Sequence, residues 1–373
     1  MFSANGVLAV AQTSISSVYL PISLTFDEQI TGLGVLSSVY FLAVAVTEVP
    51  GGLFSSSLGP KRITLIGSTI ASLAILATTF APSFAVLVVL RVVVGAGLGL
   101  ATPSMLVLTM RSLGKGASGR GVALFSIASS LGAAVGFPAW SILAADYGWR
   151  TSLFVDGAFT GAVTLVVLFM VPFDEGSSTQ RRMGFELRTI LRDRRIQVLS
   201  LAFFGTGITV VLIGNFMVYY LETVLSLQPG YAGAITGLGA LTPISSYLLF
   251  GRFYDRGVSA RATVFGATVG LGIGTALVSI HSLIAAIVGI VVCGVSGPPI
   301  SIAVFSISRR LAPRPDLEAL TIGFVDAVSL VGVFAGALLF PLFVVALGYP
   351  LAWILGGAAC IVLTAPVLAF KNL

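Results

Sequence analysis

The sequence predicts an all-α integral membrane protein with twelve transmembrane helices arranged as two pseudo-symmetric six-helix halves. Charge is scarce and clustered, apolar runs of membrane-spanning length separate the clusters, and the two halves resemble each other. Only 9% of the 373 residues are Asp, Glu, Lys or Arg, and 57% are hydrophobic. A soluble domain of this composition would have too little polar surface to stay in solution.

The apolar runs are about twenty residues long, which is the length that crosses a hydrocarbon core of ~30 Å. They predict spans at 3–24, 30–54, 62–80, 84–110, 119–144, 150–171, 196–222, 231–251, 261–280, 283–307, 318–345 and 349–370. The longest polar stretch divides these spans six and six. We therefore expect an N-terminal half at 1–172, a cytoplasmic linker at 173–195 and a C-terminal half at 196–373. The linker is read either as solvated chain or as partly an interfacial helix on anionic lipid.

Basic residues lie almost entirely on one side of the predicted spans. Alternate loops and the tail carry eighteen of the twenty Lys and Arg residues, and the opposite loops carry only Arg150. Cytoplasmic loops are rich in Lys and Arg, so this pattern places these loops and both termini in the cytoplasm, in a plasma or inner membrane. The net charge of +6 then has a topological cause, and no nucleic-acid partner is expected.

Few residue types suited to catalysis or metal binding are available. The single histidine, His281, sits at a predicted loop, and Cys293 and Cys360 each lie inside an apolar run. No spacing suggests a disulfide or a metal site. We therefore expect no enzyme activity, no cofactor and no metal, and a monomer in the lipid bilayer that acts on a small molecule and on protons.

The two halves correspond at an offset of about 200 residues. The fifth span contains Ser126, Ser129, Gly132 and Gly136 and is followed by Gly148. The eleventh contains Asp326, Ser329, Gly332 and Gly336 and is followed by Gly348. Duplicated halves are typical of alternating-access transporters, whose sites lie at the midplane between the repeats.

Short motifs extend this pattern. The loop after the second span carries Gly52, Gly59, Lys61 and Arg62, and the loop after the eighth carries Gly251, Asp255 and Arg256. The fourth span reads Arg91-x-x-x-Gly95-x-Gly97, and the fifth reads Gly132-x-x-x-Gly136-Phe-Pro138. With twelve spans and the repeat, these motifs resemble the major facilitator superfamily over essentially the whole chain.

The resemblance implies a transporter whose charged loops latch one side of the protein in one conformation. In the first loop Ser56 and Ser57 occupy the Asp-Arg positions of the family motif, whereas Asp255 and Arg256 keep them in the second. The alternative is that these loop charges only set topology. The Gly132/Gly136 and Gly332/Gly336 pairs, with Gly95 and Gly97, predict close helix contacts, and Pro138 a kink.

Four ionisable residues lie inside predicted spans, where charge is costly and marks function. Arg91 needs an internal carboxylate or an anionic substrate, and the family resemblance links its position to proton coupling. Asp326 is the favoured protonation site, because its repeat equivalent is Ser126 and the fold alone does not demand a charge there. Glu48 and Asp156 are interpreted as having either a structural or a functional role. For Asp156 the structural interpretation is an ion pair with Arg150.

Polar side chains could complete a pocket near these charges. Asn215 and Tyr219 are four residues apart in the seventh span and share a helical face. Gln12 and Tyr19, seven apart in the first span, are expected on roughly one stripe.

Three hypotheses follow. The first is a secondary transporter of a small organic molecule, coupled to protons, with export slightly favoured. The second is an organic-anion uptake carrier or exchanger in which Arg91 binds the substrate. The third is a non-transporting receptor of the same fold, which the lack of a large extramembrane domain disfavours.

Overall fold

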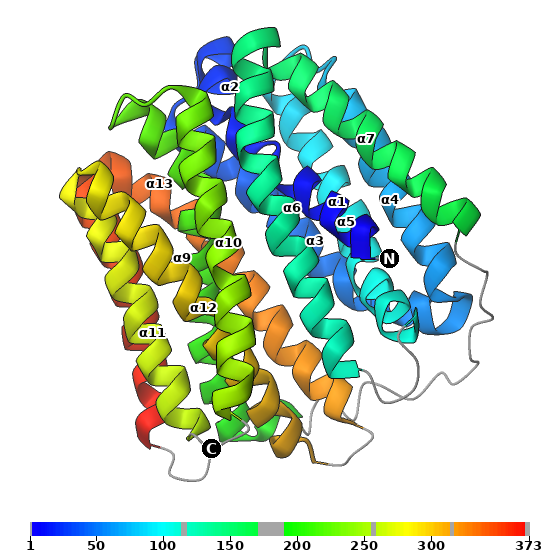
Figure 1. Cartoon of the computed structure of the whole chain (residues 1–373), viewed down its shortest axis with the longest axis vertical. Helices are drawn as coiled ribbons and strands as arrows, with labels where there is room; N and C mark the ends of the chain where they lie inside the picture. Colours follow the sequence, from blue (N-terminus) through cyan, green and yellow to red (C-terminus); the bar gives the residue numbers. More distant parts are fainter. Residues whose placement is uncertain (1, 113–117, 171–189, 255–258, 314–316, 370–373) are drawn as a thin grey trace. The chain divides into compact units, whose positions relative to one another are not determined.

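The computed structural model describes residues 2–112, 118–170, 190–254, 259–313 and 317–369. Within these ranges the chain is helical and forms no strand (Figure 1). Nine of the described helices are long and apolar enough to cross a membrane. The all-α membrane fold predicted from charge spacing is confirmed.

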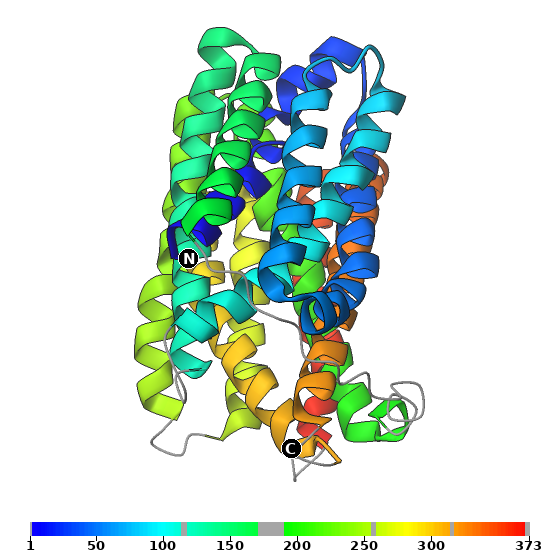
Figure 2. The same cartoon turned by 90° about the vertical axis from the view of Figure 1, so that its right-hand side faces the viewer.

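Six expected spans occupy the first part of the chain. They are formed by α1 (Phe2–Thr13), η1 (Ser16–Val18), α2 (Tyr19–Phe26), α3 (Ile30–Leu58), α4 (Pro60–Thr78), α5 (Phe84–Ser112), α6 (Ser118–Tyr147) and α7 (Trp149–Met170). Here α5 packs against α3 and α4, α6 against α1, and α7 against α4. The neighbouring α3, α4 and α5 appear in shades of blue and cyan in Figure 2.

The other six spans follow the same plan. They are formed by α9 (Arg194–Thr223), α10 (Pro229–Tyr254), α11 (Ala260–Leu277), η2 (Val278–Ile280), α12 (Leu283–Leu311), α13 (Glu318–Thr364) and η4 (Ala365–Ala369). Two expected spans merge in α13, which is interrupted at Gly348 with φ 81° and ψ 164°. Here α11 packs against α12 and α13.

The chain divides into two compact units. The first unit holds residues 1–180 and 214–240, and the second holds 181–213 and 241–373. Both α9 and α10 therefore contribute residues to each unit. Most of the expected linker lies outside the described residues, and the expected boundaries at 172 and 196 stay a prediction.

Equivalent positions of the repeat have equivalent backbone geometry. Gly148, between α6 and α7, has φ 86°, and Gly348 has φ 81°. Glycine adopts such left-handed values without the steric cost that a side chain carries. The Lys61 Nζ donates to the Leu168 carbonyl at 2.6 Å, and the Arg261 guanidinium reaches the Leu368 carbonyl at 3.5 Å. The same helix end is thus capped by a cation in both repeats.

The first span differs from the continuous helix expected at 3–24. The helix breaks after Thr13, and buried hydroxyls bond the carbonyls that the break leaves free. The Thr13 hydroxyl donates to the Val10 carbonyl at 2.8 Å, and the Ser16 and Ser17 hydroxyls donate to the Thr13 carbonyl at 3.0 and 2.9 Å. The Trp140 indole also donates to the Val10 carbonyl at 2.8 Å. Backbone N–H and C=O groups inside a membrane must find hydrogen-bond partners within the protein, and the hydroxyls of this serine-rich run supply such partners.

Candidate functional site

Arg91 lies on α5 and faces α3. Gly95 is one turn further along on the same side, and it packs directly on the backbone carbonyl of Tyr40 in α3. This close approach places the Arg91 guanidinium over the Tyr40 ring, 4.4 Å from its centroid. A cation over an aromatic face is attracted by the ring quadrupole. Gly97 faces the other way and packs against Gly67 and Ala71 of α4.

Asp156 lies on α7 and is fully buried. The Thr160 hydroxyl lies 3.5 Å from its Oδ1, and the Ser14 side chain, at the break of the first span, lies close to the carboxylate. The possible pair with Arg150 does not form. The Arg150 guanidinium donates instead to the Thr79 and Ala81 carbonyls at 2.6 and 3.2 Å, at the end of α4, and stacks on Trp149.

Arg91 and Asp156 interact electrostatically inside the first unit, yet they form no direct ion pair. Their side chains belong to residues that are 3% and 0% exposed. The Arg91 Nε and the Asp156 Oδ2 are both buried and have no hydrogen-bond partner among the described residues. One unused donor and one unused acceptor therefore lie in the same buried region, where an unmade hydrogen bond is costly.

A hydrogen-bonded group lies beside this pair. The Ser37 hydroxyl of α3 bonds the Tyr19 hydroxyl and accepts from the Asn215 Nδ2 at 3.0 Å. Tyr19 also interacts electrostatically with Arg91. We call Arg91, Asp156, Tyr40, Tyr19, Ser14, Ser37 and Asn215 the polar cluster; all belong to the first unit.

Other expected site residues lie outside the polar cluster. Tyr219 is half-buried and lies close to Ser23. Gln12 is exposed while Tyr19 is buried, so the expected shared stripe is absent, because the helix breaks between them. Glu48 is half-buried on α3. Asp326 lies in the second unit, half-buried, and no hydrogen bond or ion pair joins it to another described residue.

The residues expected to form a latch are placed unevenly. Gly52 has open space around it, Gly59 turns the chain with φ 92°, and Arg62 is exposed. Lys61 is buried, and its ammonium caps α7. Gly251 lies within α10, and Asp255 and Arg256 lie outside the described residues.

The glycine pairs lie at close helix contacts in each unit. In the first, α6 packs Gly132 on the Gly6 carbonyl and Gly136 on Thr13 and Val10 of α1. In the second, α13 packs Gly332 on the Phe204 carbonyl and Gly336 on Ile208 of α9. Pro138 lies inside α6, next to Gly233 and Gly237 of α10.

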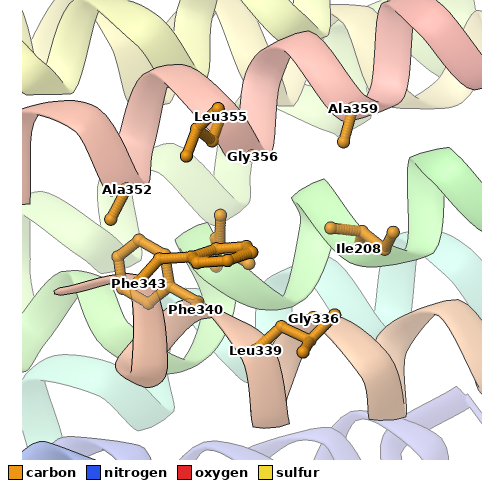
Figure 3. Close-up of a pocket in the computed structure, with 10 residues that line it drawn as sticks. Ile208, Gly336, Leu339, Phe340, Phe343, Ala352, Leu355, Gly356 and Ala359 are labelled. Atoms are coloured by element: carbon orange, nitrogen blue, oxygen red, sulfur yellow. The ribbon is translucent and has the colours of Figure 1, made fainter. Parts of the chain in front are cut away.

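The second unit has an apolar cavity at the position equivalent to Asp156. Gly356 lies as far beyond Gly348 as Asp156 lies beyond Gly148. Leu212 is the repeat equivalent of Ser14, because it lies as far beyond Phe204, which Gly332 contacts, as Ser14 lies beyond Gly6, which Gly132 contacts. Figure 3 shows the cavity between α9 and the two arms of α13. Its volume is about 70 Å³, and it is lined by Ile208, Leu212, Gly336, Leu339, Phe340, Phe343, Ala352, Leu355, Gly356 and Ala359.

Three members of the polar cluster were not expected from the sequence. Ser14, Ser37 and Tyr40 are common residue types in membrane helices, and none carries a charge that would mark it. The signal for Ser14 was the run Thr13-Ser-Ile-Ser-Ser17, since clustered hydroxyls accompany helix breaks. No comparable signal marked Ser37 or Tyr40.

The sequence model described as Major Facilitator Superfamily matches residues 1–226 and 199–372. The 3-(3-hydroxy-phenyl)propionate transporter of Escherichia coli K12 is 24% identical over 318 residues, 82% of this chain and 76% of that protein. The probable sulfoacetate transporter SauU of Cupriavidus necator is 31% identical over 137 residues, 37% of this chain and 32% of that protein.

Solved structures share the fold. The nucleoside transporter NupG superposes with a TM-score of 0.80 at 12% identity, covering 100% of this chain and 97% of NupG. A bacterial homolog of the human lysosomal transporter Spinster, inward-facing and unoccupied, gives 0.82 at 16% identity, covering 99% and 94% of the two chains. At these identities the likeness concerns the fold alone.

Proposed function

Because the chain belongs to the Major Facilitator Superfamily and is a membrane transporter rather than an enzyme, we propose that it carries a small organic anion by alternating access. Arg91 is the proposed anion-binding residue. The observation that carries this proposal is a buried guanidinium whose Nε bonds none of the described residues and which pairs directly with no carboxylate among them. Arginine stays charged at all physiological pH values and matches carboxylate and sulfonate oxygens with its planar donors.

The names of the relatives agree with this choice of substrate class. The two relatives named above are transporters of a phenylpropionate and, probably, of sulfoacetate, both organic anions. Tyr40 and Tyr19 place aromatic rings beside Arg91, which suits an anion with an apolar body.

The test is binding to purified protein, with 3-(3-hydroxyphenyl)propionate, sulfoacetate and inorganic phosphate as probes. A bound anion raises the melting temperature, since ligands that bind only the folded state stabilise it. Arg91→Gln is expected to weaken binding at least about thirtyfold, because losing one partner of a buried charged pair costs about 2 kcal/mol or more.

Arg194→Gln is the matched control, because it removes an exposed arginine at the start of α9. It should bind the probes like the unaltered protein. Equal affinity in the Arg91→Gln protein, or no binding of any probe to the unaltered protein, would refute the anion proposal.

A second candidate function is proton-coupled export of a small organic molecule, with Asp326 as protonation site. It is favoured by a half-buried carboxylate in a membrane-spanning helix that is bonded to no other described residue. In liposomes, substrate should then change the luminal pH, and Asp326→Asn should abolish that change. An unaltered pH signal in this variant would remove Asp326 from the coupling step.

The membrane orientation belongs to the same proposal. The concentration of Lys and Arg on alternate loops supports a plasma or inner membrane location with both termini in the cytoplasm. It is further proposed that the protein works as a monomer of two halves, 1–172 and 196–373, and that Gly52, Gly59, Arg62, Gly251, Asp255 and Arg256 latch that side. Lys61 is the least suited of these residues, because its ammonium already bonds α7.

A further inference from the structure

We propose that the apolar cavity of the second unit binds a segment of a lipid acyl chain, which enters from the membrane between the two arms of α13. The cavity lies between these arms and α9, with Phe340 and Phe343 beside it (Figure 3). It contains no residue of the polar cluster, so the site is independent of the proposed anion transport.

The lining of the cavity determines the class of ligand that it can hold. Every lining residue is a glycine, alanine, leucine, isoleucine or phenylalanine, so no polar side chain faces the space. A buried water needs two to four polar partners, and apolar cavities therefore stay dry and take up apolar molecules. The ligand must be a hydrocarbon group.

The volume favours a chain over a ring. The cavity measures about 70 Å³. That is about half of the ~150 Å³ that an engineered apolar cavity in another protein offers to benzene. A narrow chain of a few methylene groups fits this space, whereas an aromatic or sterol ring is too wide for it.

The mouth of the cavity opens onto the surface that faces the membrane. At the inner end Leu212 and Ala352 are 1% and 0% exposed. At the outer end Leu339, Phe343 and Leu355 are 41, 38 and 40% exposed. Exposed leucine and phenylalanine on a spanning helix contact the hydrocarbon of the bilayer. The cavity is thus continuous with the lipid-facing surface.

The surrounding sequence excludes a polar partner at this mouth. Between Asp326 and Lys371 the chain contains no Asp, Glu, Lys, Arg or His. Charged lipid headgroups and charged peptides would find no complementary group here. Acyl chains, in contrast, are the molecules that surround an uncharged spanning helix.

Depth in the membrane agrees with an acyl chain of one leaflet. Among the lining residues of α13, Ala352 lies four residues beyond the turn at Gly348, and Gly336 lies twelve residues before it. At 1.5 Å per residue the cavity extends from ~6 to ~18 Å from that turn. Half of the hydrocarbon core is ~15 Å thick, so this range matches the acyl chains on the Gly348 side.

The first repeat carries larger side chains at two equivalent positions. Trp140 stands in the place of Phe340, and Phe159 in the place of Ala359. The Trp140 indole also bonds the Val10 carbonyl at 2.8 Å and so fills space between α6 and α1. The fold therefore does not require a cavity here, and a void forfeits packing contacts. An acyl chain in the second unit supplies contacts that protein side chains make in the first.

The experiment follows the fluorescence of Trp353. Its ring packs on Phe340 with the centroids 4.6 Å apart, so a bromine atom on a chain inside the cavity lies close to the indole. The full-length protein is placed in vesicles of phosphatidylcholine brominated midway along one acyl chain, and in the unbrominated lipid for reference. We expect the brominated lipid to quench Trp353. Trp140 and Trp149 lie in the first unit and give a constant background.

Ala359→Phe puts into the cavity the side chain that the first repeat has at the equivalent position. We expect it to reduce the quenching at least about twofold, because the interior is close-packed and a ring and a chain cannot share the space. Ala358→Phe is the matched control, since it adds the same ring at the exposed neighbouring residue. It should be quenched like the unaltered protein.

Equal quenching in the Ala359→Phe and unaltered proteins would overturn the proposal, because the chain would then touch only the surface. An equal loss in Ala358→Phe would overturn it as well. If Ala359→Phe does not fold, Phe343→Ala decides, because it widens the mouth and should increase the quenching of Trp353. Unchanged or weaker quenching in that variant would refute acyl-chain binding.

Discussion

The first and second repeats share their helix contacts and differ in what those contacts enclose. Gly132 brings α6 onto the Gly6 carbonyl, and Gly332 brings α13 onto the Phe204 carbonyl. Behind the first contact lie Ser14 and Asp156, and behind the second lie Leu212 and Gly356 around an apolar cavity. Both repeats therefore keep the glycines that fix helix distance, while the buried charges Arg91 and Asp156 have uncharged equivalents in the second repeat.

The difference also separates two kinds of residue in the chain. Residues whose role is geometric recur in both repeats, such as Gly148 and Gly348 with φ of 86° and 81°. Arg91 lies seven residues beyond the start of α5 and has the apolar counterpart Ile290, seven residues beyond the start of α12; Asp156 has the small counterpart Gly356. All four of these residues lie in packed helices, so burial does not separate the charged pair from its counterparts. We infer that comparing equivalent positions of the two repeats distinguishes structural residues from site residues better than burial does.

The largest expected effect comes from moving the first unit's chemistry into the second. Leu212→Ser combined with Gly356→Asp recreates the Ser14 and Asp156 pair without an arginine beside it. We expect a loss of about 3 to 5 kcal/mol in the free energy of unfolding at neutral pH, because the buried charge has no partner. Since burial favours the protonated acid, the loss should grow as pH rises.

The measurement is thermal unfolding in detergent across pH. Leu212→Ser combined with Gly356→Asn is the control, because it has the same shape and no charge. If the two double variants unfold alike at every pH, the second unit tolerates charge as the first does, and the contrast between the repeats fails.

A middle-sized effect should be equal in the two repeats. Gly132→Ala and Gly332→Ala each add a Cβ that meets a backbone carbonyl of the neighbouring helix. We expect each to lower stability by about 1 to 3 kcal/mol, as overpacking does. Gly266→Ala, whose Cβ would have nothing within 4 Å, should be neutral or slightly stabilising. Chemical unfolding measures all three, and a large inequality between the first two would break the structural equivalence of the repeats.

The smallest effect is expected for Arg261→Met, which alters one of the two cations that cap the last helix of each repeat. Lys61→Met removes a buried 2.6 Å bond to the Leu168 carbonyl and should cost about 1.5 to 3 kcal/mol. Arg261→Met removes a longer, exposed bond at 3.5 Å to Leu368 and should cost about 0.5 kcal/mol or less. Melting temperatures compare the two variants, and a reversed order would show that burial does not set the strength of these caps.

Much of the fold could be predicted from the sequence because a bilayer imposes a simple rule. Helix lengths follow from the hydrocarbon thickness, and charges gather where helices leave it. The gaps between predicted spans at 25–29, 55–61 and 145–149 contain the ends of α2, α3 and α6. The prediction of a continuous helix for the first span was wrong. Serine and threonine hydroxyls can replace backbone hydrogen bonds inside a membrane, and a hydropathy pattern does not show such a replacement.

The site divides in the same way. The sequence by itself identified Arg91 and Asp156 as costly charges inside spans, because charge in hydrocarbon is unfavourable whatever the fold. Only the tertiary structure decided that Arg150 bonds carbonyls just beyond the end of α4, that Asp156 lies close to Ser14 and that Arg91 lies over Tyr40. Partners of a membrane charge depend on how helices distant in sequence are rotated and packed, and close contacts such as Gly95 on Tyr40 set that rotation.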